Sequence, residues 1–433
     1  HRTYRALWAA QRLYCRARGA AALARRAARA AALQLHYRLQ LCLPVRPDDA
    51  VFAAYWNRGY TCSPAALEAT ARALVPGLRT SWICRPEDAH TVPGATRVLH
   101  PGTAAYWTAL ARSKYLVNNV NFDRRLVKRH GQILVQTHHG TPLKTMGTDL
   151  VHRPAAAGTM DFDQLLRNID KWDFSLSANQ HSTLVWERTY PAGYTTLEYG
   201  SPRNDVFHRT RPEEIARLRE RLGVPEGSTA LLYAPTHRDY RRDGHHPLDL
   251  DRFVRVLGPR FVVLARSHYL DTASGTTAGR SLHPRLLDVS AHPSVEELCL
   301  ASDALVTDYS SLMFDYVNLD RPVVLHLEDR RAYEAARGTY FDLESFPPGA
   351  VARDQDELHG IFATDHWRGP RSAQRRAAFR ARFCPYDDGH AAERVVRRIF
   401  LGDTSGPALP VSSGGRQPSG VPRQVTVREY TNG

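Results

Sequence analysis

Short apolar segments alternate with helix-forming segments from about residue 50 to residue 326, and this alternation restricts the possible fold more than any other feature. The apolar segments have the length and the Val, Ile, Leu and Phe content of buried strands. They lie at 50–54, 80–84, 115–118, 132–137, 173–177, 229–234, 260–265, 303–307 and 322–326. Strands that alternate with helices form parallel sheets covered on both faces. The sequence therefore predicts an α/β protein.

The length of the chain predicts two domains, because 433 residues exceed one ordinary hydrophobic core. A polar, turn-rich stretch at 200–205 marks the expected boundary. We expect an N-terminal domain at 47–205 and a C-terminal domain at 206–402. A tail at 403–433, rich in Gly, Ser and Pro, is expected to be disordered.

Residues 1–46 form a separate basic segment with ten arginines and no acidic residue. Its composition favours a helix, which either lies on an anionic membrane surface or packs on the body as a linker. The formal net charge of +14 indicates an anionic partner. We expect no nucleic acid, because no nucleic-acid-binding motif is present. No apolar run is long enough for a transmembrane helix.

The sequence predicts no resident metal or cofactor. The six cysteines form neither a CxxC pair nor a Cys/His cluster, so we expect reduced thiols rather than a zinc site or a disulfide framework. Dinucleotide-binding and Walker-type motifs are also missing, and no convincing DxD-like carboxylate pair follows an early predicted strand. Mg²⁺ is expected only if it arrives with a phosphorylated substrate. The chain begins with His1 rather than Met, and we expect it to be a fragment of a longer product.

Four polar clusters each follow a predicted strand directly, at 138–144, 235–239, 266–268 and 308–311. In open α/β sheets, ligands bind beyond the carboxyl ends of the strands. We therefore expect the four clusters to line one cleft between the two domains.

The cluster at 308–311 has the features of a phosphate site. Ser310 and Ser311 open a predicted helix, where free backbone N–H groups and the positive helix end meet two hydroxyls. An ordinary serine N-cap is the alternative interpretation of this pattern. Arg266 and His268 follow a neighbouring predicted strand and would add positive charge.

His139 and His268 are candidate acid–base groups, because imidazole titrates near neutral pH. Within the pair His138–His139 only one side chain can face the cleft, since neighbours on extended chain point in opposite directions. Gly140 permits a close approach of the backbone, and Lys144 carries the charge to hold a phosphate.

These clusters belong to a larger ordered set of motifs that resembles the CDP-glycerol:poly(glycerophosphate) glycerophosphotransferase family, the teichoic-acid primases and polymerases. The matching motifs are HGTPLKTMG (139–147), GSPRNDVF (200–207), LYAPTHRD (232–239), ARSH (265–268), SDALVTDYSSLMFDYVNLDRPVV (302–324) and EDRRAYEAARGTYFD (328–342). The resemblance covers about residues 50–400. It implies a GT-B architecture, with two Rossmann-like domains and the site between them. It also implies transfer of a polyol phosphate from a CDP-polyol to a hydroxyl, with release of CMP.

The resemblance also implies roles for individual residues. His139 matches the expected general base, and His268 matches a second histidine that would stabilise the phosphoryl group. The expected substrate-binding residues are Gly140, Thr141, Lys144, Arg203, Asn204, Asp205, Pro235, Thr236, Arg238, Arg266, Asp308, Ser310, Ser311, Asp315 and Arg337. His138, His237 and Ser201 stand where the family often has an aromatic residue.

The family resemblance implies CDP-glycerol as the donor and a lipid-linked or polyol-phosphate acceptor, in bacterial cell-wall polymer synthesis. It places the protein peripherally on the cytoplasmic face of the membrane. Two alternatives use a similar cleft: a CDP-ribitol ribitolphosphotransferase, and a GT-B glycosyltransferase that acts on a nucleotide sugar.

Overall fold

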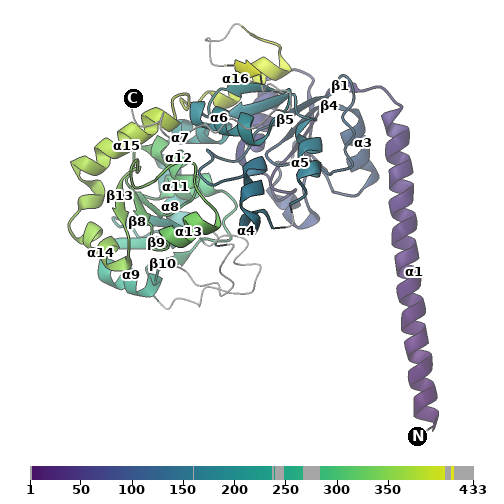
Figure 1. Ribbon diagram of the computed structural model, residues 1–433, viewed down its shortest axis with the longest axis horizontal. Coiled ribbons are helices and arrows are strands. Elements are labelled where there is room, and N and C mark those ends of the chain that lie inside the picture. The colour runs from purple at the N-terminus through teal and green to yellow at the C-terminus, as the bar shows by residue number, and fades with distance from the viewer. Residues whose placement is uncertain are drawn as a thin grey trace.

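The computed structural model describes residues 2–158, 160–236, 238, 248–266, 283–404 and 411–413, and it contains two sheets (Figure 1). The first has eight strands in the order β14-β7-β6-β5-β4-β1-β2-β3, and the second has six in the order β10-β9-β8-β11-β12-β13. Named strands pair in parallel except β14, which is antiparallel to β7. Two parallel α/β domains are the expected GT-B arrangement.

The first sheet is buried on both faces, because alternate residues of its central strands enter different cores. Phe52 packs with Trp82 and Val117 on one face, and Val51 packs with Leu116 on the other. Its strands are β1 (Arg46–Ala53), β2 (Arg79–Ile83), β3 (Arg97–Leu99), β4 (Ser113–Asn118), β5 (Ile133–Gln136), β6 (Phe174–Ser177), β7 (Thr195–Glu198) and β14 (Val411–Ser413). The helical elements between them are α2 (Cys62–Leu74), η1 (Pro86–Thr91), α3 (Ala104–Arg112), η2 (Gly147–His152), α4 (Pro154–Ala157), α5 (Phe162–Ile169) and α6 (Gln180–Thr189).

The second sheet follows the same rule, with Leu231 in one core and Leu232 in the other. Its strands are β8 (Thr229–Ala234), β9 (Phe261–Ala265), β10 (Leu286–Asp288), β11 (Ala304–Thr307), β12 (Val323–His326) and β13 (Ala350–Ala352). Its helical elements are η3 (Pro202–Asn204), α7 (Asp205–Arg209), α8 (Pro212–Arg221), α9 (Leu250–Leu257), α11 (Val295–Ala301), α12 (Leu312–Tyr316), η4 (Val317–Leu319), α13 (Arg330–Ala336), α14 (Gln355–Ala363), η5 (His366–Arg368) and α15 (Pro370–Phe383).

Each of the nine predicted strands is present, within a few residues of its expected bounds. The strands β3, β7, β10, β13 and β14 were not predicted, because each is short and contains at most two large apolar residues. β14 lies in the tail that we expected to be disordered. Its residues 411–413 pair with β7, and the rest of the tail beyond residue 404 lies outside the described residues.

The last helix, α16 (Ala391–Phe400), returns to the first sheet although it follows the second sheet in the chain (Figure 1). Ala392, Val395 and Val396 are buried in the same core as Phe52. The expected second domain, 206–402, therefore includes a helix whose apolar face packs on the first domain.

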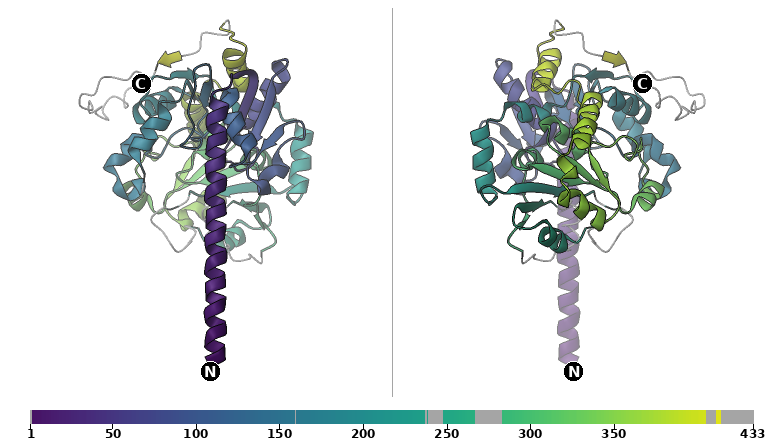
Figure 2. Two further views of the ribbon diagram at one scale, coloured as in Figure 1. Left: turned by 90° about the vertical axis from the view of Figure 1, so that its right-hand side faces the viewer. Right: turned by 90° about the vertical axis from the view of Figure 1, so that its left-hand side faces the viewer.

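The basic N-terminal segment forms one helix, α1 (Arg2–Leu41), which extends away from the body of the protein (Figures 1 and 2). Its C-terminal end packs on the body: Tyr37 is buried, and its hydroxyl accepts a hydrogen bond from the Val127 N–H at 2.9 Å. His36 contacts Thr108 at 2.8 Å. No helix in the part of the chain that the structure describes is long and apolar enough to cross a membrane.

Candidate functional site

The two domains meet at Gly140, which follows β5 of the first sheet. A Cβ atom on this glycine would lie 2.9 Å from Ser311 Oγ and 3.0 Å from Arg203 Nη2. Its φ of +133° is also one that other residues rarely adopt. A glycine is therefore needed both for the backbone and for the close approach of Ser311, which lies in the second domain. The cluster after β5 and the cluster after β11 lie together, as expected.

The two adjacent histidines have different surroundings. His138 is buried with a φ of 53°, its ring stacks on Trp186 at 4.1 Å between centroids, and its Nε2 contacts Ser175 Oγ at 2.9 Å. The His139 side chain is exposed to solvent. Only one of the two imidazoles is therefore accessible to a substrate, and it is the one for which the sequence predicts a catalytic role.

His139 is held with one ring nitrogen available. Its Nδ1 lies 3.2 Å from the carbonyl oxygen of Asn119, and a carbonyl only accepts hydrogen bonds, so the proton belongs on Nδ1 and a lone pair on Nε2. The ring of Tyr55 meets the His139 ring edge-on at 5.7 Å. This is the tautomer that a general base requires.

The His139 imidazole is neutral near pH 7. Solvent reaches part of the His139 side chain, but many protein atoms surround the ring, and this burial lowers the pKa of His139 to about 4. The hydrogen bond to Asn119 opposes the shift, and the positive charges of Arg203 and Lys144 add to it.

Arg203 joins the site of the first domain to the second domain. Its guanidinium forms a buried ion pair with Asp315 of α12, through Nη2 to Oδ2 and through Nε to Oδ1 at 3.3 Å. Its Nη1 donates to the His139 carbonyl oxygen at 3.1 Å. Burial disfavours the charged guanidinium, but the Asp315 carboxylate outweighs it and raises the pKa of Arg203. Arg203 and Asp315 thus fix the backbone that carries His139.

Arg238 and Asp308 form a second buried network at the ends of β8 and β11. Arg238 binds Asp329 with two bonds, at 2.7 Å and 3.0 Å, and lies 2.8 Å from Asp308. Its guanidinium also lies 5.2 Å from the ring centroids of Tyr309 and Tyr333. Protein groups therefore hold this arginine from several sides.

Ser310 and Ser311, which we expected to bind phosphate, precede a short helix. α12 has five residues and continues as a 3₁₀ turn, which limits the helix dipole. Ser310 Oγ accepts the Leu312 N–H at 3.3 Å, and Thr236, after Pro235, donates its N–H to Asp308 at 2.8 Å. Both serines are half-buried beside the junction of the domains.

The segment after Gly140 crosses to the second domain. The Thr145 N–H donates to the Gly338 carbonyl at 3.1 Å, and the Tyr340 N–H donates to the Leu143 carbonyl at 2.7 Å. These bonds place Lys144 opposite Thr339. The crossing brings the motif at 139–147 beside the motif that contains Arg337, which is half-buried.

Comparison with known proteins identifies the family. A model of the family described as CDP-Glycerol:Poly(glycerophosphate) glycerophosphotransferase matches residues 35–401. The chain belongs to this family. The resemblance that we predicted from the ordered motifs is therefore confirmed.

Named members of the family align with most of the chain. The teichoic acid poly(glycerol phosphate) polymerase of Bacillus subtilis (strain 168) is 31% identical over 376 residues, which are 83% of this chain and 49% of the relative. A protein of the same name in Bacillus spizizenii is 32% identical over 378 residues, 84% of this chain and 95% of the relative. The chain thus spans about half the length of the B. subtilis relative and nearly all of the B. spizizenii relative.

Solved structures support the fold. The wall teichoic acid polymerase TagF superposes with a TM-score of 0.75 at 29% identity, over 83% of this chain and 89% of that chain. A UDP-GlcNAc 2-epimerase from Methanocaldococcus jannaschii superposes with a TM-score of 0.52 at 8% identity, over 82% and 99% of the chains. The second likeness is one of fold alone, and the GT-B expectation is confirmed.

Within this family site, some predicted residues lie away from the cleft. Asn204 Nδ2 donates to Asp387 at 2.7 Å. Both carboxylate oxygens of Asp205 accept backbone N–H groups at the start of α16, from Ala391 and Ala392, at 2.9 Å each. These two side chains hold the returning helix. Thr141 accepts a bond from the buried Asn179 at 3.1 Å.

Arg266 is half-buried after β9 and donates to the His292 carbonyl at 2.8 Å. Burial lowers its pKa, and the charge of Glu296 opposes this shift. The negative charge of Glu296 also interacts with Arg203 and with Tyr55, so this residue of the second domain lies near the site residues of the first domain. Glu296 was not predicted as a site residue, because it follows the short strand β10, which was itself not predicted. His268 and His237 lie outside the described residues.

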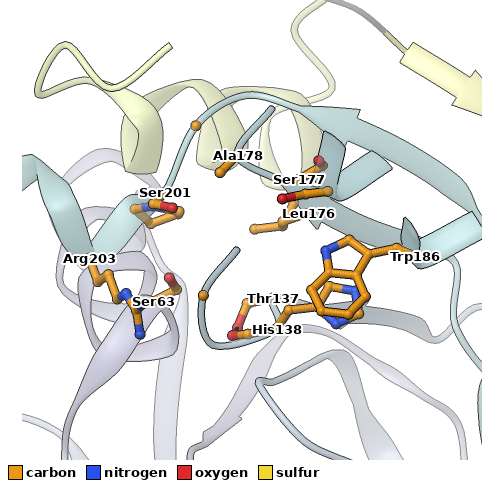
Figure 3. Close-up of a pocket in the computed structure, with 13 residues that line it drawn as sticks. Ser63, Thr137, His138, Leu176, Ser177, Ala178, Trp186, Ser201 and Arg203 are labelled. Carbon is orange, nitrogen blue, oxygen red and sulfur yellow. Dashed lines mark hydrogen bonds between the residues drawn. The ribbon is translucent and has the colours of Figure 1, made fainter. Parts of the chain in front are cut away.

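A small cavity is lined by the segment that follows β5 in the first domain (Figure 3). His138 and Trp186 lie on one side of it, and Ser63 and Arg203 on another. Its volume of about 20 Å³ holds a water molecule rather than a nucleotide. Among the described residues, no group of three or more His, Cys, Asp or Glu side chains could hold a metal ion.

Proposed function

We propose that this protein is a CDP-glycerol glycerophosphotransferase, which transfers glycerol phosphate from CDP-glycerol to an acceptor hydroxyl and releases CMP in teichoic acid synthesis. The observation that carries the proposal is the position of His139. It is a neutral imidazole with a free Nε2, held at the junction of two domains beside Gly140 and Ser311.

His139 Nε2 takes the proton from the acceptor hydroxyl as its oxygen attacks the β-phosphorus of CDP-glycerol. A new O–P bond forms, the bond from the β-phosphorus to the bridging oxygen breaks, and CMP leaves with that oxygen. A neutral imidazole with a lone pair on Nε2 can accept this proton as the transition state develops. Positioning and positive charge provide most of the acceleration.

Groups around the junction bind the pyrophosphate in this proposal. Lys144, Arg266 and Arg337 supply positive charge, and Ser310 and Ser311 donate hydrogen bonds. His268 stabilises the transferred phosphoryl group.

A further set of predicted residues orients these groups through contacts within the protein. This set comprises Arg203, Asn204, Asp205, Thr236, Arg238, Asp308 and Asp315.

The proposed reaction uses no resident metal, and Mg²⁺ takes part only as a companion of the substrate phosphates. CMP release should therefore persist after the protein is treated with EDTA and assayed in Mg²⁺-free buffer. Complete loss that is restored by added Mg²⁺ would assign the ion a required role.

We also propose a lipid-linked acceptor at the cytoplasmic face of the membrane. The basic helix α1 supports a peripheral position, because its projecting part has many arginines and no acidic residue. Vesicles with anionic lipid should bind the full chain in low salt, and a variant without residues 2–30 should bind them more weakly.

The direct test is CMP release from CDP-glycerol by the purified protein, with and without a synthetic glycerol phosphate oligomer as acceptor. Acceptor-dependent release supports the proposal. CDP-ribitol is the second donor to assay, because a teichoic acid ribitol-phosphate primase of B. spizizenii is 28% identical over 85% of this chain. Release from CDP-ribitol alone would change the polyol, and consumption of a UDP-sugar alone would contradict phosphate transfer.

A further inference from the structure

A strained turn follows β1, next to the proposed base. Tyr55, Trp56 and Asn57 have positive φ values of 42°, 56° and 69° in succession. L-residues rarely adopt this left-handed conformation, and a bulky residue such as tryptophan is a marked exception. Such strain persists only where surrounding contacts fix it, and it gathers at functional sites.

Contacts on three sides hold this turn. The Tyr55 N–H donates to Asn119 Oδ1 at 2.8 Å, and the Arg58 N–H donates to the Ala54 carbonyl at 3.0 Å. The Arg85 N–H, after β2, donates to the Asn57 carbonyl at 3.0 Å. Because the Asn119 carbonyl also binds His139 Nδ1, one residue fixes both the turn and the base.

Trp56 is the residue that these contacts hold out to solvent. Its side chain is 53% exposed, whereas five of the seven tryptophans are buried and the other exposed one, Trp8, lies on α1. Its neighbour Tyr55 packs edge-on against His139. The fold gains little from an exposed indole in a strained conformation, and glycine would fit this backbone more easily.

The surroundings fit an acceptor chain of alternating polyol and phosphate. An exposed indole face packs on the C–H groups of a polyol or sugar, and tryptophan provides the most contact area of any side chain for this purpose. Arg58 and Arg85 belong to the same two loops and place positive charge near the turn for the phosphates.

We propose that Trp56 is an acceptor-binding residue, whose indole packs on the polyol or sugar unit that carries the attacking hydroxyl. This inference rests on the proposed function and adds the acceptor subsite to it. In this inference the donor nucleotide binds through Lys144, Arg266, Arg337 and the two serines, so we expect its binding to be independent of Trp56.

The test compares Trp56→Ala, Trp56→Phe and Trp56→Gly in the full chain, with Trp8→Phe as the matched control. The substrates are CDP-glycerol and a soluble glycerol phosphate oligomer. The inference predicts a rise of roughly tenfold in KM for the oligomer in the Ala and Gly variants, with KM for CDP-glycerol unchanged and partial recovery in the Phe variant. The Gly variant should keep or raise the melting temperature, because the strain is relieved. Unchanged KM for the oligomer in the Ala variant would overturn the inference.

A binding measurement separates this inference from the proposed reaction. In a Trp8→Phe background, Trp56 is the exposed tryptophan, so acrylamide quenching of fluorescence reports mainly on it. The oligomer should protect Trp56 from acrylamide even without turnover. Quenching that the oligomer leaves unchanged, in a protein that transfers glycerol phosphate, would overturn the acceptor subsite alone. A wild type without CMP release would instead contradict the proposed function.

Discussion

Replacing Gly140 with alanine tests whether the site requires the observed approach of the two domains. The added Cβ would lie 2.9 Å from Ser311 Oγ, 3.1 Å from Ser311 Cβ and 3.0 Å from Arg203 Nη2. Each of these distances is shorter than ordinary van der Waals contact, so the second domain or Arg203 must move. His139 would move with them, because its carbonyl binds Arg203.

The expected loss of stability has two parts. Forcing a non-glycine residue to a φ of +133° destabilises the fold by about 1–3 kcal/mol. Overpacking against Ser311 and Arg203 adds about 1–3 kcal/mol. We expect urea unfolding to show the sum of both, and CMP release to fall on the order of 100-fold as the base is displaced.

Gly131→Ala is the matched control, because Gly131 also has a positive φ, +84°, but has no neighbouring atom within 4 Å of an added Cβ. Gly131→Ala should lose only the stability that the unfavourable φ costs, and it should keep the wild-type rate of CMP release. In a double-mutant cycle, Ser311→Gly should restore part of the stability lost in Gly140→Ala. Equal losses in Gly140→Ala and Gly131→Ala, with no coupling to Ser311, would refute the interdomain contact.

Four further predictions test the surroundings of the site. Asp205→Ala removes the acceptor of two N–H groups of α16 and should lower the free energy of unfolding, measured in urea, by about 1–2 kcal/mol. An unchanged free energy of unfolding would show that Asp205 does not cap this helix. Asn179→Ala should lower the free energy of unfolding by about 2–3 kcal/mol, because the buried Phe383 carbonyl and the Ser182 N–H lose their hydrogen-bond partner. A loss as small as that of an alanine substitution at an exposed position would contradict this prediction. Because burial lowers the pKa of His139 to about 4, kcat/KM should stay level as the pH falls through 6.5 and decline only near pH 4. A decline centred at pH 6.5 would contradict the lowered pKa of His139. Folding stability should also decrease between pH 6.5 and about 4, since the unfolded His139 and His181 take up protons there and the folded ones do not.

Much of the fold was predictable because its central strands are long apolar runs. Residues 229–234 and 304–307 show no alternation, as expected for strands buried on both faces. β7 and β10 were not predicted, because short strands depend on their neighbours rather than on their own sequence. The return of α16 to the first sheet also depends on tertiary contacts of Val395 and Asp205, which no local pattern reveals.

The candidate site was predicted in outline, and its individual roles less well. The cluster after β5 lies beside the cluster after β11, because each sheet presents the carboxyl end of that strand to the junction of the domains. Arg238 was expected to bind substrate, and its ion pairs with Asp308 and Asp329 could not be predicted from the residue types alone. Trp56 gave no signal, because its importance lies in its φ and its exposure, and neither can be read from residue types.

The base assignment of His139 is the central claim, and acceptor-dependent CMP release by His139→Asn tests it most directly. His130→Asn is the control, because His130 is an exposed histidine before β5. We predict that His139→Asn lowers kcat by about 10²–10⁴-fold while CDP-glycerol still binds, and that His130→Asn keeps the wild-type rate. Near-wild-type kcat in His139→Asn would contradict the account.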